Sequence, residues 1–396
     1  MQASMTSPVK HEIHPFRIDL SSRISRLELL VKNTELPSNP LYPGAGLEFG
    51  LQLDFLRDLQ AHWINDFDWA KQEAKLNQVS HYKTTIGDQT IHFVHEKSQD
   101  ENAIPLLLLH GWPGSFHEFL PVIKPLTERH INLEGRPVSF NVVVPSLPGF
   151  LFSSAPPQDW KDLDSAKLFN TLMTDVLGYS KYAIHGTDWG SNVAYHLYES
   201  FTSNVRAAHF TFLPFIPPLP QHIADNNIPL SEHQQVTLQR TVGWLSTDQG
   251  YFQAQTFKPN DIGLALHDNP IGQLAWIGTQ YHRSSDPRAG TGPSVLTKDA
   301  ILTAVSLYYL TGSFHSSVWQ YARNVNPFRD YTKTPSDAPL LWSSFKYEIV
   351  LWPESHVAKV GNLVSYKEHD FGGHFAGLDN PVALIEDLRD IGRFFK

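Results

Sequence analysis

The 396-residue chain contains no cysteine, which excludes disulfide bonds and metal sites built on thiolates. It also has no excess of basic residues, since 31 Lys and Arg stand against 40 Asp and Glu, a net charge of −9. This balance argues against nucleic acid or an anionic membrane surface as a partner. The longest apolar runs, around residues 104–109 and 141–144, are far too short to span a bilayer.

Residues 1–10 have neither the charged n-region nor the apolar h-region of a secretory signal, so we expect a soluble, cytoplasmic protein. The sequence is compatible with a homodimer. It lacks a Gly-x-Ser-x-Gly motif, a phosphate-binding loop and internal repeats. The histidine pairs His11/His14 and His92/His95 have no further ligands in a cluster, so we expect no metal and no other cofactor.

From residue 104 onward, patterns of buried strands alternate with helical patterns, which is typical of an α/β fold with a mainly parallel central sheet. The four prolines of residues 214–220 interrupt this alternation, and a mainly helical stretch follows. Such an insertion predicts a lid over the strand ends, where ligands of open α/β sheets bind. The strands are expected at residues 104–109, 140–144, 182–184, 205–212, 339–344 and 362–366.

These patterns divide the chain into four segments. Residues 1–97 form an N-terminal region of helical patterns and one β-hairpin. Residues 98–213 and 336–396 form the two parts of the sheet domain. Residues 214–335 form the helical lid between them.

Residues 186–190 read Gly-Thr-Asp-Trp-Gly and lie between a strand pattern and a helical pattern. This is the spacing of a nucleophile elbow, in which small flanking residues permit a sharp turn. The central residue is commonly Ser, but here it is Asp188. A carboxylate attacks an electrophilic sp³ carbon and leaves an alkyl ester that water must cleave, so epoxides and alkyl halides are suitable substrates. In the alternative interpretation, Asp188 only caps the following helix.

Cleavage of such an ester needs a base and an acid that orients it. In the chain order of this fold class, the acid follows a late strand and the histidine follows the last strand. His374 has the position of the base, with His369 as its rival. Glu348 is the preferred acid, because it comes three residues after Phe345 at the strand end, whereas Glu354 lies further into a loop.

An oxyanion hole requires two backbone N–H groups. Trp189 follows the nucleophile and Trp112 lies in the turn after the strand 104–109, so we predict these as the donors; a cis Trp112–Pro113 bond is compatible with this turn. Opening an epoxide also requires a proton donor, and a phenol of the lid is suitable. The candidate phenols of the insertion are Tyr251, Tyr281, Tyr308, Tyr309 and Tyr321.

The chain resembles the epoxide hydrolases of the α/β-hydrolase fold, microsomal type, which include soluble fungal members. The resemblance covers nearly the whole chain and rests on co-linear segments at residues 67–72, 91–95, 110–116, 186–191, 250–251 with 258–259, 306–311 and 372–376. It implies an α/β-hydrolase fold whose N-terminal region packs across the lid. It also implies that a small apolar epoxide reacts with water to give a vicinal diol, through a covalent alkyl ester on Asp188 and without a cofactor.

Carried over to single residues, the resemblance implies Tyr251 and Tyr308 as the proton-donating pair and supports Glu348 as the acid. The family usually has a proline just before this acid, and the chain does not. Thr187 and Leu151 also replace residues that are commonly glycine in the family. The identity of the epoxide, and the choice between detoxification and a biosynthetic step, stay open.

Two alternative functions follow from the same residues. A haloalkane dehalogenase uses the same first step but needs a halide cradle, which a His-Gly-Asn-Pro turn would favour; here Trp112 occupies the Asn position. A non-catalytic hydrolase-like receptor usually lacks the nucleophile or the base, whereas Asp188 and His374 are both present.

Overall fold

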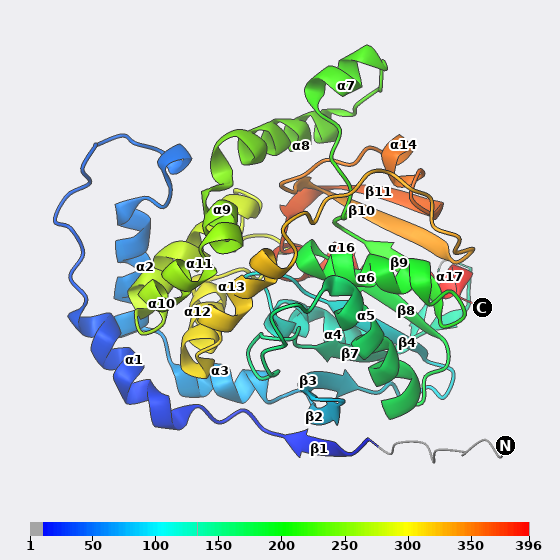
Figure 1. Cartoon of the computed structure of the whole chain (residues 1–396), viewed down its shortest axis with the longest axis horizontal. Helices are drawn as coiled ribbons and strands as arrows, with labels where there is room; N and C mark the ends of the chain where they lie inside the picture. Colours follow the sequence, from blue (N-terminus) through cyan, green and yellow to red (C-terminus); the bar gives the residue numbers. More distant parts are fainter. Residues whose placement is uncertain (1–10, 133, 396) are drawn as a thin grey trace.

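A mixed sheet of nine strands forms the centre of the computed structural model, which describes residues 11–132 and 134–395 (Figure 1). The strands β7, β4, β8, β9, β10 and β11 run parallel to one another. The strands β1, β2 and β3 pair antiparallel and extend the sheet beside β7. In spatial order, the strands are β1 (Ile13–Phe16), β2 (His81–Ile86), β3 (Gln89–Glu96), β7 (Phe140–Pro145), β4 (Ile104–Leu109), β8 (Tyr182–Gly186), β9 (Val205–Phe210), β10 (Pro339–Tyr347) and β11 (Asn362–Gly373).

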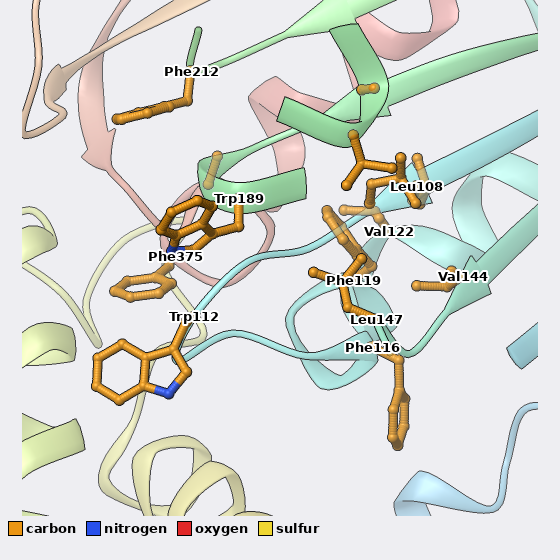
Figure 2. Packing of buried hydrophobic residues seen from close by; sticks show 14 of the residues in the cluster. Leu108, Trp112, Phe116, Phe119, Val122, Val144, Leu147, Trp189, Phe212 and Phe375 are labelled. Carbon is orange, nitrogen blue, oxygen red and sulfur yellow. The ribbon is translucent and has the colours of Figure 1, made fainter. Parts of the chain in front are cut away.

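The central strands are continuous apolar runs because helices cover the sheet. In β4, the residues from Leu106 to Leu109 are all buried. Phe119 and Val122, which follow β4 in the chain, pack with Leu108 and Val144 of the sheet (Figure 2). The covering helices are α4 (Leu120–Thr127), α5 (Asp162–Thr171), α6 (Asp188–Ser200), α16 (Pro381–Arg389) and α17 (Ile391–Phe394).

A helical insertion separates β9 from β10, as the proline-rich break predicts. The helix α12 of this insertion has a clear start and end. The Thr297 hydroxyl accepts a hydrogen bond from the Ala300 N–H at its start, and Gly312 ends it with a φ of +71°. The helices of the insertion are α7 (Pro220–Asp225), α8 (Glu232–Gly243), α9 (Gly250–Phe257), α10 (Pro259–Leu266), α11 (Pro270–Ser284), α12 (Lys298–Thr311) and α13 (Phe314–Arg323).

The N-terminal region contacts this insertion through α1 (Ser21–Asn33) and α2 (Leu53–Asn65), which pack against α11 and α12 (Figure 1). The Arg23 guanidinium donates a hydrogen bond of 2.5 Å to the Leu310 carbonyl oxygen. The Lys298 ammonium lies 2.7 Å from the Asp58 carboxylate. A third helix, α3 (Trp69–Leu76), leads into the β2–β3 hairpin.

The observed architecture confirms the expected α/β fold with a mainly parallel sheet, a helical insertion and an N-terminal region that packs across it. The exact limits of the four segments stay a prediction. Several strands differ from expectation. The strand β1 has no clear sequence pattern, β8 continues to Gly186 and β9 already ends at Phe210. The strands β10 and β11 continue to Tyr347 and Gly373, so that Glu348 and His374 directly follow them. None of the helices formed by residues 11–132 and 134–395 combines the length and the hydropathy needed to cross a membrane.

Candidate active site

Asp188 lies at the sharp turn that joins β8 to α6. Its φ of +46° is in the left-handed region, which costs a non-glycine residue on the order of 1–3 kcal/mol. Two glycines permit the turn. A Cβ on Gly186 would lie 2.7 Å from the Ala194 side chain. A Cβ on Gly190 would lie 2.1 Å from the Leu109 carbonyl oxygen. The strand–turn–helix geometry of an elbow is therefore present, with a carboxylate at its centre.

The alternative interpretation expects the Asp188 carboxylate to cap α6, but among the residues that it describes the structure shows no side-chain hydrogen bond that caps this helix. The Oδ2 atom of Asp188 lies 3.2 Å from Nε2 of His374. The other ring nitrogen of His374, Nδ1, lies 2.7 Å from Oε1 of Glu348. Only 4% of the His374 and Glu348 side chains is exposed, against 15% for Asp188. The structure thus brings the predicted nucleophile, base and acid into one buried row, with Asp188 at the accessible end.

The rival residues of this row lie elsewhere. His369 is 2.5 Å from the Asp387 carboxylate through Nε2, on the side of α16. Glu354 is exposed at the start of the short helix α14 (Glu354–Val357). The geometry therefore favours His374 and Glu348 over both rivals.

Two opposing effects act on the pKa of His374. Burial disfavours the charged imidazolium, but the negative charges of Glu348 and Asp188 and their hydrogen bonds to the ring outweigh this effect. The pKa of His374 consequently lies well above its usual value. While both carboxylates are charged, the ring therefore holds its proton at neutral pH.

The turn after β4 supplies a backbone donor to the nucleophile. The Trp112 N–H donates a hydrogen bond of 2.6 Å to Oδ1 of Asp188, and the Trp112–Pro113 peptide bond is cis. Gly111 permits this approach, because a Cβ at this position would lie 1.9 Å from Oδ1 of Asp188. The part of the chain that the structure describes shows no hydrogen bond from the Trp189 N–H to the carboxylate, so the second donor stays a prediction.

Two phenols of the insertion lie above Asp188, and they are Tyr251 and Tyr321. The Tyr251 ring stacks on Trp112 at 5.7 Å, with an interplanar angle of 16°. The Tyr321 ring meets Trp189 edge to face at 4.8 Å, and its buried hydroxyl has no hydrogen-bond partner among the described residues. Burial and the Asp188 charge raise the pKa of both phenols, so both keep their protons.

Tyr308, the second phenol implied by the family resemblance, does not reach this pocket. Its buried hydroxyl donates a hydrogen bond of 2.8 Å to the Gly114 carbonyl oxygen. Tyr281 of α11 donates to the neighbouring carbonyl oxygen, that of Pro113, at 3.3 Å. The prediction of Tyr308 as a proton donor therefore disagrees with the geometry, because its hydroxyl is held by the turn that contains Trp112. Tyr309 also points away and donates to Asp268 at 2.9 Å.

The pocket above Asp188 is mainly apolar and aromatic, which suits a hydrophobic ligand. Figure 2 shows the Trp112, Trp189 and Phe375 side chains gathered on the same side of the turn after β4. The residues that line the pocket are Asp188, Trp189, Asn192, Phe212, Trp244, Tyr251, Phe252, Tyr321, Pro327, Phe328 and Ile349.

Glu118 is a buried carboxyl group next to the site that no sequence motif singles out. A Cβ on Gly114 would lie 2.6 Å from Oε2 of Glu118, so the carboxyl group packs against the turn that holds Trp112. Burial raises its pKa to about 8, with further contributions from the Asp188 and Glu348 charges, while His374 acts in the opposite direction. Glu118 is therefore uncharged at neutral pH. Its only sequence signal is an acidic residue within an apolar stretch.

The described residues contain no group of three or more His, Asp or Glu side chains arranged to hold a metal ion. The polar groups that line the pocket instead include the Asp188 carboxylate, two phenols and the Asn192 amide, and the Trp112 N–H contacts the carboxylate from the turn after β4. Such groups suit proton transfer and nucleophilic attack on an apolar electrophile.

The sequence also matches known protein families. The family description "Epoxide hydrolase N terminus" matches residues 13–119, and "alpha/beta hydrolase fold" matches residues 104–256. Epoxide hydrolase 1 of Sus scrofa is 30% identical over 402 residues, which covers 95% of this chain and 88% of the pig protein. Juvenile hormone epoxide hydrolase 2 of Ctenocephalides felis is 29% identical over 405 residues, with coverages of 95% and 84%.

Solved structures agree with these matches. The structure of Aspergillus niger epoxide hydrolase superposes with a TM-score of 0.83 at 30% identity and covers 100% of both chains. The juvenile hormone epoxide hydrolase of the silkworm Bombyx mori gives a TM-score of 0.85 at 26% identity, with coverages of 97% and 95%. Since the likeness extends over nearly the whole chain, the chain belongs to the epoxide hydrolases of the α/β-hydrolase fold, enzymes that hydrolyse an epoxide to a diol.

Proposed function

We propose that the chain hydrolyses an apolar epoxide to a vicinal diol through a covalent ester on Asp188. In the first step, a carboxylate oxygen of Asp188 attacks the less hindered oxirane carbon, and the bond between this carbon and the ring oxygen breaks. The apolar pocket supports this step, because it takes up the body of the substrate and leaves the carboxylate as the reacting group.

The ring oxygen gains negative charge as the oxirane opens, and it must receive a proton. Tyr251 and Tyr321 are proposed as the donors. Both line the pocket with Asp188, and both phenols are protonated at neutral pH. Residues 214–335, which carry both phenols, are proposed to act as the lid.

His374 is proposed as the base of the second step. Ester formation removes the negative charge of Asp188, which is one of the causes of the raised pKa of His374. The imidazolium then loses its proton more easily, and this proton replaces the one that the phenol gave to the ring oxygen. The neutral imidazole ring can then accept a proton from water. This water attacks the ester carbonyl carbon, while Glu348 keeps the ring oriented through Nδ1. The bond between this carbon and the substrate oxygen then breaks, the substrate oxygen takes up a proton and the diol leaves, so that Asp188 is again a carboxylate and His374 again carries its proton.

The carbonyl oxygen of the ester becomes an oxyanion during this attack, and two backbone N–H groups are proposed to stabilise it. The Trp112 N–H already contacts Oδ1 of Asp188, and the Trp189 N–H follows the nucleophile in the chain. We assign Tyr308 a positioning role in this step, since its hydroxyl holds the carbonyl group of Gly114 in the same turn.

One observation carries the proposal: the Asp188 carboxylate lies between the Trp112 N–H and Nε2 of His374 at the base of an aromatic pocket. The test is incubation of the wild-type protein and Asp188→Asn with a panel of neutral epoxides and, separately, haloalkanes. We expect diol from the wild type and no halide release, with diol formation lost in Asp188→Asn. Halide release without diol would instead support the dehalogenase alternative.

A further inference from the structure

The end of α11 and the segment that follows it, residues 284–297, lie against the turn that carries His374. The His374 N–H donates a hydrogen bond of 2.8 Å to the Ser284 carbonyl oxygen. Four residues further along the turn, the Leu378 carbonyl oxygen accepts a hydrogen bond of 2.8 Å from the Val295 N–H. The helical insertion therefore contacts the backbone of the base itself, in addition to carrying the two pocket phenols.

Asp286 is the buried acidic side chain of this segment. None of its side chain is exposed, and its Oδ2 atom accepts a hydrogen bond of 2.9 Å from the N–H of Gly372, two residues before His374. The Asp286 N–H donates a hydrogen bond of 2.7 Å to the Asp379 carboxylate, five residues after His374. Asp286 is thus bonded to the chain on both sides of the base.

Arg288 neutralises Asp286 and fixes its orientation. Its Nε and Nη2 atoms donate hydrogen bonds of 2.8 and 2.6 Å to the two carboxylate oxygens of Asp286. Burial raises the pKa of Asp286, but the hydrogen bonds from Arg288 and from the Gly372 N–H outweigh this effect and lower it. Asp286 is therefore charged at neutral pH, and a hydrogen bond from a backbone N–H to a charged carboxylate is stronger than one between neutral groups.

The turn before His374 depends on such contacts. Gly372 has a φ of +108°, which favours glycine, and a Cβ here would lie 2.8 Å from the Phe345 side chain. Because glycine restricts the backbone least, hydrogen bonds from neighbouring segments determine where this turn lies. The His374 ring has to stay 2.7 Å from Glu348 and 3.2 Å from Asp188. A displacement of about 1 Å can slow a catalysed step about 10²-fold.

We propose that Asp286 is a positioning residue for the base: it holds the backbone of the turn so that the His374 ring stays between Glu348 and the ester on Asp188. This inference rests on the proposed function, since it requires His374 to act in ester hydrolysis. Asp286 does not line the pocket above Asp188. Its loss should therefore slow ester hydrolysis, whereas ester formation, which uses the Asp188 carboxylate and the phenols, should continue.

The test compares Asp286→Ala and Asp286→Asn with the wild type. Both carboxylate oxygens of Asp286 accept hydrogen bonds from N–H groups, so the amide nitrogen of asparagine would face one of these donors, while its oxygen would keep the other. Glu199→Ala is the matched control. Glu199 is a half-buried carboxylate that Arg329 holds with hydrogen bonds of 3.0 and 3.1 Å, about 16 Å along α6 from Asp188.

The quantities measured are the rate constants of ester formation and of ester hydrolysis, from rapid-quench experiments with excess epoxide and intact-mass detection of the ester. Both are first-order constants at saturating epoxide. A misfolded fraction consequently lowers the amplitude of each phase and leaves the two rate constants unchanged. A purely structural role of Asp286 would appear as a lower Tm with both rate constants at their wild-type values.

We expect ester hydrolysis to be slowed about 10- to 100-fold in Asp286→Ala and about 3- to 10-fold in Asp286→Asn, as for the loss of a charged or a neutral hydrogen bond. Ester formation should change by less than about threefold in both variants, and Glu199→Ala should match the wild type in both steps. Ester hydrolysis at the wild-type rate in either variant, or equal slowing of both steps, would overturn the positioning role and leave the proposed function intact. Failure of the wild type to form an ester would overturn both.

Discussion

The change His374→Gln separates the two chemical steps. The glutamine side chain cannot act as a base, but it leaves the Asp188 carboxylate and both pocket phenols in place. Ester formation on Asp188 should continue, because this step uses the carboxylate and a phenol. Ester hydrolysis should nearly stop, because the group that lies 3.2 Å from Oδ2 of Asp188 no longer accepts a proton from water.

The size of the effect follows from the role of the base. General base catalysis contributes about 10²- to 10⁴-fold to a rate, or about 3–5 kcal/mol of activation free energy. The variant should therefore accumulate the ester, and intact-mass measurement should detect protein heavier by the mass of one epoxide. The wild type turns the ester over and should show little of it. Peptide mapping should locate the added mass on Asp188.

His369→Gln is the matched control, because His369 pairs with Asp387 on the side of α16 rather than with Asp188. This variant should turn over many equivalents of epoxide and show no accumulated ester. If His374→Gln gave diol at the wild-type rate, or if His369→Gln accumulated the ester instead, the assignment of the base would be wrong.

Three further predictions concern residues around the triad. Tyr251→Phe and Tyr321→Phe should each slow ester formation about 10- to 100-fold in rapid-quench experiments, and the double variant should nearly abolish it. A double variant that forms the ester as fast as the wild type would contradict the assignment of the two phenols as proton donors. Tyr308→Phe should slow ester hydrolysis more than ester formation, since it frees the Gly114 carbonyl group; an equal effect on ester formation would return Tyr308 to the role of acid. Glu118 keeps its proton up to about pH 8 in the folded protein but loses it near pH 4 when unfolded, so wild-type stability falls as the pH rises between these values. The Tm of Glu118→Gln relative to the wild type should therefore increase from pH 5 to pH 8, and a constant difference would show that Glu118 is not protonated.

The sequence predicted the row of Asp188, His374 and Glu348 because each residue is tied to a local pattern. The elbow requires glycines at fixed spacing, and a parallel sheet brings the ends of its strands to one edge, so chain order implies proximity. The choice of Glu348 over Glu354 also followed from the distance to the strand end, and Glu348 lies 2.7 Å from His374 in the structure.

The phenols could not be identified in this way. Tyr308 and Tyr321 lie on successive helices, α12 and α13, and which of them faces Asp188 depends on how these helices pack on the sheet. Residue patterns describe the buried side of a helix but not its neighbour, and both tyrosines are almost completely buried.

The covalent ester on Asp188 is the central claim, and a single turnover in ¹⁸O-labelled water tests it most directly. Attack by the carboxylate transfers one of its own oxygens to the substrate, and water then attacks the ester carbonyl carbon. We therefore expect a first-turnover diol without the label and a protein with ¹⁸O in the peptide that contains Asp188. Labelled diol from the first turnover, together with an unlabelled Asp188 after many turnovers, would contradict it, since water would then attack the epoxide directly.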